Sequence, residues 1–301
     1  MQGHGGQILL ILILSGFHPV MVEMKIGIHV SIAGGLSRSI ERANERGCDT
    51  IQIFARTPRA WKAKPWDPTE VDLFVEGRES SGISPVIIHT CYLLNLATTK
   101  TDLREKSMDA LVDDLNRAEM GGIEYVVIHP GSSKGTEGGA QRVRDCCLES
   151  LDRSGTSAQL LIENVAGGGG KVGESFQEIA EIVEGTELGV LLDTCHAFAA
   201  GIPIHLDTAS VLDDFDDTVG IEKLKALHLN DSYDEFGKHV DHHQNIGEGY
   251  IGREGFRNIL GEERIRSLPG VLETPHRATK DPTDDLKNIA AIRGILVEVG
   301  G

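Results

Sequence analysis

The chain has 301 residues, of which 40% are hydrophobic and 25% charged, and its formal net charge is -17. This length suits one large core, and the ordinary composition predicts a globular fold. Because phosphate contacts come from lysine and arginine, the acidic balance argues against a generic polyanion binder. The five cysteines are scattered without a Cys-x-x-Cys pair, which is typical of reduced thiols in a cytoplasmic protein.

Residues 1–23 differ from the rest and contain the apolar run ILLILIL at 8–14. No lysine or arginine precedes this run, no small-x-small cleavage site follows it, and it is far shorter than the ~20 apolar residues of a membrane span. We interpret 1–23 as a non-native or disordered extension from a start codon assigned too far upstream, with Met21 or Met24 as the true first residue. We expect one domain at 24–301 and no membrane association.

From Met24 onward, the sequence alternates an expected strand and an expected helix eight times. The strands are expected at 25–30, 50–54, 85–89, 125–129, 159–163, 188–193, 225–229 and 270–273. They are continuous apolar runs, as parallel strands buried on both faces are. Each strand with its helix has the size of one βα unit. We therefore predict a single-domain (β/α)8 TIM barrel, with an open doubly wound sheet as the alternative.

Seven of the apolar runs end in an acid or a histidine. These end residues are His29, His89, His129, Glu163, Asp193, His228 and Glu273. In a TIM barrel the carboxyl ends of all the strands open on one mouth, where active sites are built. The pattern therefore predicts an active site at this mouth.

Several of these residues, with others on the following loops, form a set of nine potential metal ligands. The nine are His89, His129, Glu163, Asp193, His196, His228, Asp241, His243 and Glu273. A catalytic zinc takes about three protein ligands, so nine suit three metals better than one. Five imidazoles and four carboxylates favour zinc, with manganese or iron as substitutes. We interpret His29 as a hydrogen-bonded structural residue.

The loop after the second strand, ARTPRAWKAKPW at 55–66, combines basic and aromatic residues without an acid. Its members of interest are Arg56, Arg59, Trp61, Lys62, Lys64 and Trp66. Such a mixture suits contacts to a nucleic-acid backbone together with stacking or wedging between bases. Tyr92 and Leu93, just after His89, are a second pair that would enter a duplex. Packing in the core is the alternative for Leu93 and Trp66.

Eight segments, in order, resemble the endonuclease IV family of apurinic/apyrimidinic endonucleases. They are GIHVSIAGGL (27–36), HTCYLLNLA (89–97), HPGS (129–132), IENVAG (162–167), DTCHAFAAG (193–201), LHLND (227–231), VDHHQNIGEG (240–249) and VLETP (271–275). The resemblance implies a zinc-dependent enzyme that hydrolyses the phosphodiester 5′ to an abasic site in double-stranded DNA. The implied products are a 3′-hydroxyl and a 5′-deoxyribose phosphate, and removal of blocked 3′ ends is also implied. It implies a monomer as well.

The resemblance also assigns roles to the candidate residues. His89, His129 and Glu163 would hold one zinc, and Glu163, as the catalytic residue, would bridge to a second. Asp193, His228 and Glu273 would complete the site of the second zinc. His196, Asp241 and His243 would hold the third. Arg59, Tyr92 and Leu93, with Trp61 nearby, would enter DNA and stabilise the extruded abasic nucleotide.

Two departures from the family pattern are present. The stretch before Arg59 reads ARTP in place of an Asn-containing loop, and Gln244 stands where a second histidine is frequent. His242 creates an alternative Asp-His-His register, which leaves open which imidazole binds metal.

Two other functions are compatible with parts of the sequence. A sugar isomerase or epimerase of the xylose-isomerase-like class needs only one or two metals. It has no use for His196, Asp241, His243 or the tryptophan loop. A non-catalytic binder of DNA lesions would lack ligands, and none is missing.

Overall fold

The computed structural model describes residues 24–275 and 282–300, and the expected extension at 1–23 lies outside them. Eight parallel strands close into a barrel in the order β1-β10-β7-β6-β5-β4-β3-β2. Their bounds are β1 (Ile26–His29), β2 (Thr50–Phe54), β3 (Val86–His89), β4 (Tyr125–Ile128), β5 (Gln159–Glu163), β6 (Gly189–Asp193), β7 (Leu224–His228) and β10 (Gly270–Leu272). The predicted (β/α)8 barrel is confirmed.

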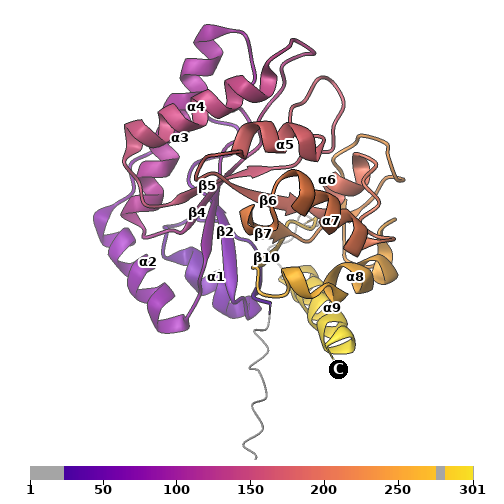
Figure 1. Cartoon of the computed structure of the whole chain (residues 1–301). Helices are drawn as coiled ribbons and strands as arrows, with labels where there is room; N and C mark the ends of the chain where they lie inside the picture. Colours follow the sequence, from indigo (N-terminus) through magenta and orange to yellow (C-terminus); the bar gives the residue numbers. More distant parts are fainter. Residues whose placement is uncertain (1–23, 276–281, 301) are drawn as a thin grey trace, which may run out of the picture.

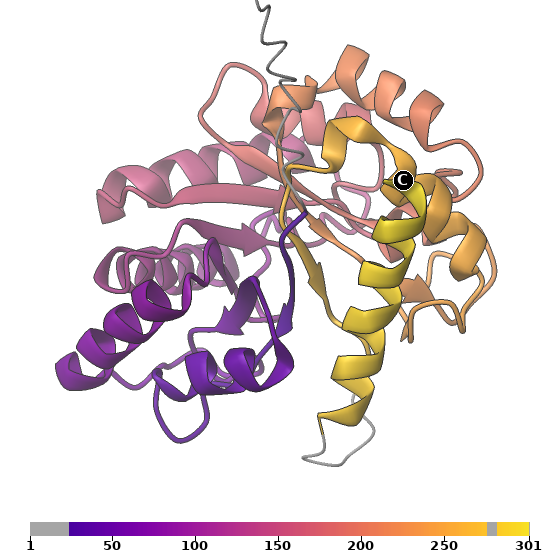
Figure 2. The same ribbon diagram turned by 90° about the horizontal axis from the view of Figure 1, so that it is seen from below.

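Helices surround the barrel on its outside, as Figures 1 and 2 show. They are α1 (Arg38–Arg46), α2 (Pro68–Ser81), α3 (Thr101–Met120), α4 (Gly139–Ser154), α5 (Phe176–Val183), α6 (Thr194–Ala199), α7 (Thr208–Thr218), α8 (Gly252–Gly261) and α9 (Thr283–Val299), with 3-10 turns η1 (Ile221–Lys223) and η2 (Glu263–Ile265). Among the helices in the described ranges, none combines the length and apolarity needed to cross a bilayer.

The inside of the barrel is closed by a small apolar cluster that is separate from the core under the helices. Its fully buried members come one each from six strands: Ile87, Val127, Leu161, Leu191, Ala226 and Val271. Because side chains alternate across a strand, the residue two positions later points to the same side. Those later residues are His89, His129, Glu163, Asp193, His228 and Glu273. The six candidate ligands thus lie directly above this apolar layer, on the side of the barrel mouth.

Two local features differ from the sequence expectation. His196, expected on a loop, lies in the short helix α6, and the carboxylate of Asp193 caps this helix by accepting from the backbone N–H of His196 at 2.8 Å. The polar loop after β7 contains an antiparallel ladder of β8 (Asp231–Ser232) and β9 (His243–Gln244). Elements this short carry no readable periodicity, which is why the sequence did not predict them.

Candidate metal centre

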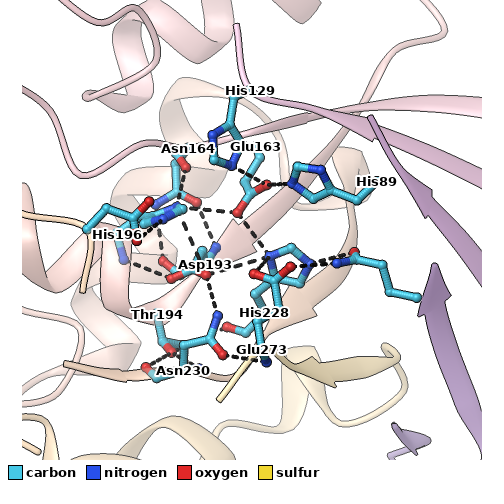
Figure 3. A network of polar contacts seen from close by, with 12 residues as sticks. His89, His129, Glu163, Asn164, Asp193, Thr194, His196, His228, Asn230 and Glu273 are labelled. Carbon is cyan, nitrogen blue, oxygen red and sulfur yellow. Dashed lines mark hydrogen bonds and ion pairs between the residues drawn. The ribbon is translucent and has the colours of Figure 1, made fainter. Parts of the chain in front are cut away.

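The candidate ligand atoms form three groups that share two carboxylates. The groups are His89, His129 and Glu163; Asp193, His196 and His243; and Glu163, Asp193, His228 and Glu273, with the atoms of each group within 4.8 Å of one another. Glu163 and Asp193 each belong to two groups, so the three positions adjoin in one pocket. Figure 3 shows the side chain of Glu163 with His89, His129 and His196 around it.

Asp241, which was expected beside His196 and His243, contacts both imidazoles. Its Oδ1 lies 3.2 Å from Nε2 of His196 and 3.2 Å from Nε2 of His243. The neighbouring His242 is largely exposed and instead has its Nδ1 3.4 Å from a carboxylate oxygen of Asp234. These contacts favour His243 over His242 as a ligand. All nine predicted residues therefore lie in one cluster, and their role as ligands stays a prediction.

Three polar atoms of this pocket are buried without a hydrogen-bond partner among the described residues: Oε2 of Glu163, Nε2 of His196 and Nε2 of His243. Oε2 of Glu163 is nevertheless 3.0 Å from Nε2 of His129 and 3.3 Å from Nε2 of His89. These atoms are thus in contact without being aligned for a hydrogen bond. Because a buried unsatisfied polar atom costs about 1–3 kcal/mol, a shared cation explains the arrangement. The donor set of imidazoles and carboxylates fits zinc.

Opposite charges stabilise each other in this pocket when it holds no metal. Complete burial opposes ionisation, yet the imidazoles of His129 and His228 keep the pKa of Glu163 well below its usual value. Burial likewise opposes protonation of His228, but Glu273 and Glu163 raise its pKa well above the usual value. The pKa of His243 rises to about 9 against the effect of burial, through Asp241 and other carboxylates. Since metal ligands must be deprotonated, metal binding would release these protons.

Backbone carbonyl groups orient three of the imidazoles. Nδ1 of His89, His196 and His243 lies 2.7, 2.9 and 3.0 Å, respectively, from such an oxygen. A carbonyl oxygen only accepts, so each of these rings carries its proton on Nδ1 and offers the Nε2 lone pair to a metal.

Two buried asparagines that the sequence reading missed hold the candidate ligand Asp193. Asn230 donates from Nδ2 to Oδ2 of Asp193 at 2.7 Å and accepts from the backbone N–H of Glu273 at 2.8 Å. Asn164 accepts from the backbone N–H of Asp193 at 2.7 Å. Their position in the sequence is the signal, because each lies one or two residues after a candidate ligand at the end of a strand.

The basic loop at 55–66 is docked on helix α3, and this corrects the expectation for one of its residues. Arg56 is buried, with Nη2 2.8 Å from Asp113 and 2.7 Å from Asp114, and it donates to the carbonyl oxygen of Trp61 at 2.7 Å. Its guanidinium therefore anchors the loop and is not free to contact DNA. Arg59 is exposed.

The aromatic candidates differ in exposure. Tyr92 is 58% exposed and packs edge-on against His89, with ring centroids 5.9 Å apart. Leu93 and Trp61 are half-buried against the core, and Lys106 stacks over the Trp61 ring at 4.6 Å from its centroid. Tyr92 also lines a pocket of about 300 Å³ together with candidate ligands, among them His89 and Glu273. An exposed aromatic side chain thus borders the metal centre.

Comparison with known proteins places this chain among barrel nucleases. A family profile described as xylose isomerase-like TIM barrel matches residues 40–294. Endonuclease 4 of Thermus thermophilus is 42% identical over 278 residues, covering 91% of this chain and 99% of that protein. The probable endonuclease 4 of Methanosphaerula palustris is 41% identical over 285 residues, covering 91% of this chain and 99% of the relative.

Solved structures agree with these relatives. The crystal structure of endonuclease IV from another strain of Thermus thermophilus has a TM-score of 0.84 and 41% identity, and the match covers 91% of this chain and 99% of that chain. A D-tagatose 3-epimerase-like protein has a TM-score of 0.68 at 20% identity, covering 92% of this chain and 98% of its own. The second similarity shows a shared fold alone.

Proposed function

The chain belongs to the endonuclease IV family of TIM barrels, and from this premise we propose that it is a metal-dependent DNA repair endonuclease specific for abasic sites. Its substrate is double-stranded DNA, and it hydrolyses the phosphodiester 5′ to an apurinic/apyrimidinic site. The observation that carries the proposal is the convergence of three ligand groups on one barrel mouth, joined by Glu163 and Asp193.

In this proposal the nine clustered residues hold three divalent ions, zinc in the first place and manganese as a substitute. His89, His129 and Glu163 serve one position, and Glu163 is shared with the position of Asp193, His228 and Glu273. His196, Asp241 and His243 serve the third. The short contacts between the members of each set support this assignment.

Metal ions at these positions would polarise the phosphoryl oxygens and lower the pKa of a water molecule. In the hydrolysis the water oxygen bonds to phosphorus, the bond from phosphorus to O3′ breaks, and a proton passes to O3′. This leaves a 3′-hydroxyl and a 5′-deoxyribose phosphate, and the same reaction at a blocked 3′ end would remove the block. Glu163 stays a ligand, because its buried carboxylate lies within 3.3 Å of three imidazoles, those of His89, His129 and His228.

The local charge at the mouth differs from that of the whole chain. The net charge of -17 repels DNA. Four ligand carboxylates facing three divalent ions would, however, leave about two positive charges in the pocket. Phosphate binding should therefore depend on metal loading more strongly than in a basic protein.

Recognition of the lesion is assigned to residues at the same mouth. Tyr92 is exposed at the pocket, Arg59 is exposed on the basic loop, and Leu93 and Trp61 are half-buried. An abasic nucleotide has no base to unstack, so its extrusion costs less than that of an intact nucleotide. We assign these four residues to DNA contact and expect a monomer to suffice.

The sugar isomerase alternative explains the geometry less well. It needs only the group around Glu163, Asp193, His228 and Glu273. It gives no reason for a further group around His196 and His243, whose Nε2 atoms are buried without a hydrogen bond. The proposed nuclease uses both.

The test is incision of a duplex with one tetrahydrofuran abasic analogue by the metal-replete protein, beside an undamaged duplex and a chelated sample. We expect one cut 5′ to the analogue, only with metal, and a product that a DNA polymerase extends because it ends in a 3′-hydroxyl. No lesion-dependent cut in the metal-replete sample would refute the proposal. A separate assay of ketose epimerisation checks the alternative.

A further inference from the structure

Gln52 is a polar residue inside an apolar strand, and it has no part in the proposed function as described so far. It lies in β2 and is fully buried. Its Nε2 donates to Oε1 of Glu273 at 2.6 Å and lies 3.0 Å from Nδ1 of His29. Its Oε1 lies 2.8 Å from Nε2 of His228. One amide therefore contacts two candidate ligands, Glu273 and His228, and a second imidazole, that of His29.

The chemistry of the neighbours allows only one orientation of this amide. The carboxylate of Glu273 is an acceptor, so the NH₂ group of Gln52 must face it, and the amide oxygen must then face His228. An amide oxygen only accepts, which requires a proton on Nε2 of His228. The second N–H of Gln52 is directed to Nδ1 of His29, which accepts it.

His228 is consequently oriented in the opposite sense to three other candidate ligands. His89, His196 and His243 carry the proton on Nδ1, held by backbone carbonyl groups. The proton on Nε2 of His228 is instead held by a side chain, and its Nδ1, whose proton a metal would displace, lies 2.9 Å from Oε1 of Glu163 and 3.4 Å from Oε2 of Glu273. A backbone carbonyl cannot be removed by substitution, whereas the partner of His228 can.

We propose that Gln52 is a positioning residue of the metal centre, which fixes His228 in the Nε2–H tautomer and holds Glu273 beside it. The proposal rests on the metal centre of the proposed function and adds a residue to it. Without Gln52 the ring of His228 can keep its proton on Nδ1, where it blocks the lone pair on the side of Glu163 and Glu273. Glu273 also loses its only described side-chain amide donor and is free to turn.

The first test measures zinc affinity by competition with a chromophoric chelator. Gln52→Met keeps the length of the side chain and removes all three polar contacts, so we expect zinc affinity to fall by about 10- to 100-fold. Thr50→Val is the matched control, because Thr50 is buried in the same strand, two residues deeper, and donates one hydrogen bond to the carbonyl oxygen of Pro85. This control should lose stability but keep wild-type zinc affinity. Equal affinity of Gln52→Met and wild type would overturn the proposal.

The second test reads the tautomer itself from ¹⁵N spectra of histidine-labelled, zinc-loaded protein. In the wild type, His228 should show a protonated Nε2 and a metal-bound Nδ1. Gln52→Glu keeps an acceptor for His228 and should keep this signature, while losing the donor to Glu273 and some zinc affinity. A wild-type His228 with a metal-bound Nε2 would overturn the proposal even if Gln52→Met failed to fold. A wild type that binds no zinc would instead contradict the proposed function.

Discussion

Replacing Asp231 by Asn should detach the loop that carries Asp241 and His243. The carboxylate of Asp231 is fully buried and accepts from five backbone N–H groups at 2.8 to 3.2 Å. These donors belong to Ser232, Gly247, Gly249, Ile251 and Gly252. One side chain thus fixes both ends of the loop. Gly249 leaves no room for adjustment, because a Cβ there would lie 2.3 Å from the carbonyl oxygen of Ser232.

The loss of stability follows from the number of hydrogen-bond acceptors that asparagine keeps. Asparagine keeps one oxygen, which serves the three donors at Oδ1, and it turns an NH₂ group toward Gly247 and Gly249. Two donors without an acceptor cost about 1–3 kcal/mol each, and we take about 2–4 kcal/mol in total because both bonds are only part-buried. Since β8 pairs Ser232 with His243, the loosened ladder should also lower the metal content.

Urea unfolding and hydrogen exchange at residues 241–252 measure the two effects. The matched control is Asp234→Asn, because Asp234 lies in the same loop and has only an exposed imidazole, that of His242, as its described ion-pair partner. That substitution should cost less than about 1 kcal/mol. If the two variants unfold alike and exchange alike, the reasoning on Asp231 is wrong.

Three further predictions concern the site and its support. Glu163→Gln should lose incision activity by orders of magnitude and lose bound metal while circular dichroism shows an intact barrel; near-normal turnover would remove Glu163 from its shared position. Asp114→Ala should lower the free energy of unfolding in urea by about 3 kcal/mol, because it leaves the buried guanidinium of Arg56 without its buried carboxylate partner. Asp113→Ala removes a 45% exposed partner of the same guanidinium and should cost under about 1 kcal/mol. Equal losses in the two variants would contradict this. In metal-free protein, carboxylates raise the pKa of His243 from 6.5 to about 9, although burial opposes this. Protonated His243 therefore stabilises the folded state fully below pH 6.5, and this contribution is lost as pH rises through 9. The melting temperature of chelated protein should fall across that window, and a flat profile would be evidence against it.

The barrel and the cluster of candidate ligands were predictable because both depend on local rules. Apolar runs separated by helical segments predict parallel strands, and an acid or a histidine at the end of seven of the eight runs predicts a shared mouth. The period of two along a strand then places Glu163 above Leu161 and Asp193 above Leu191. No knowledge of distant contacts was needed for these inferences.

The supporting residues were not predictable in the same way, since their partners are far away in the chain. Arg56 reads as a basic loop residue until the structure places it against Asp113 and Asp114, which lie 57 and 58 positions later. Gln52 reads as one polar residue in a buried strand, and its partner Glu273 is 221 positions away. The sequence shows such residues only as exceptions to a pattern.

The most direct test of the account is anomalous X-ray scattering from crystals of the protein purified without chelators. The account predicts three peaks at the barrel mouth, each inside one of the three ligand groups, with the zinc absorption edge. A single peak at Glu163, Asp193, His228 and Glu273, or none at His196 and His243, would contradict the trinuclear centre from which the proposed reaction follows.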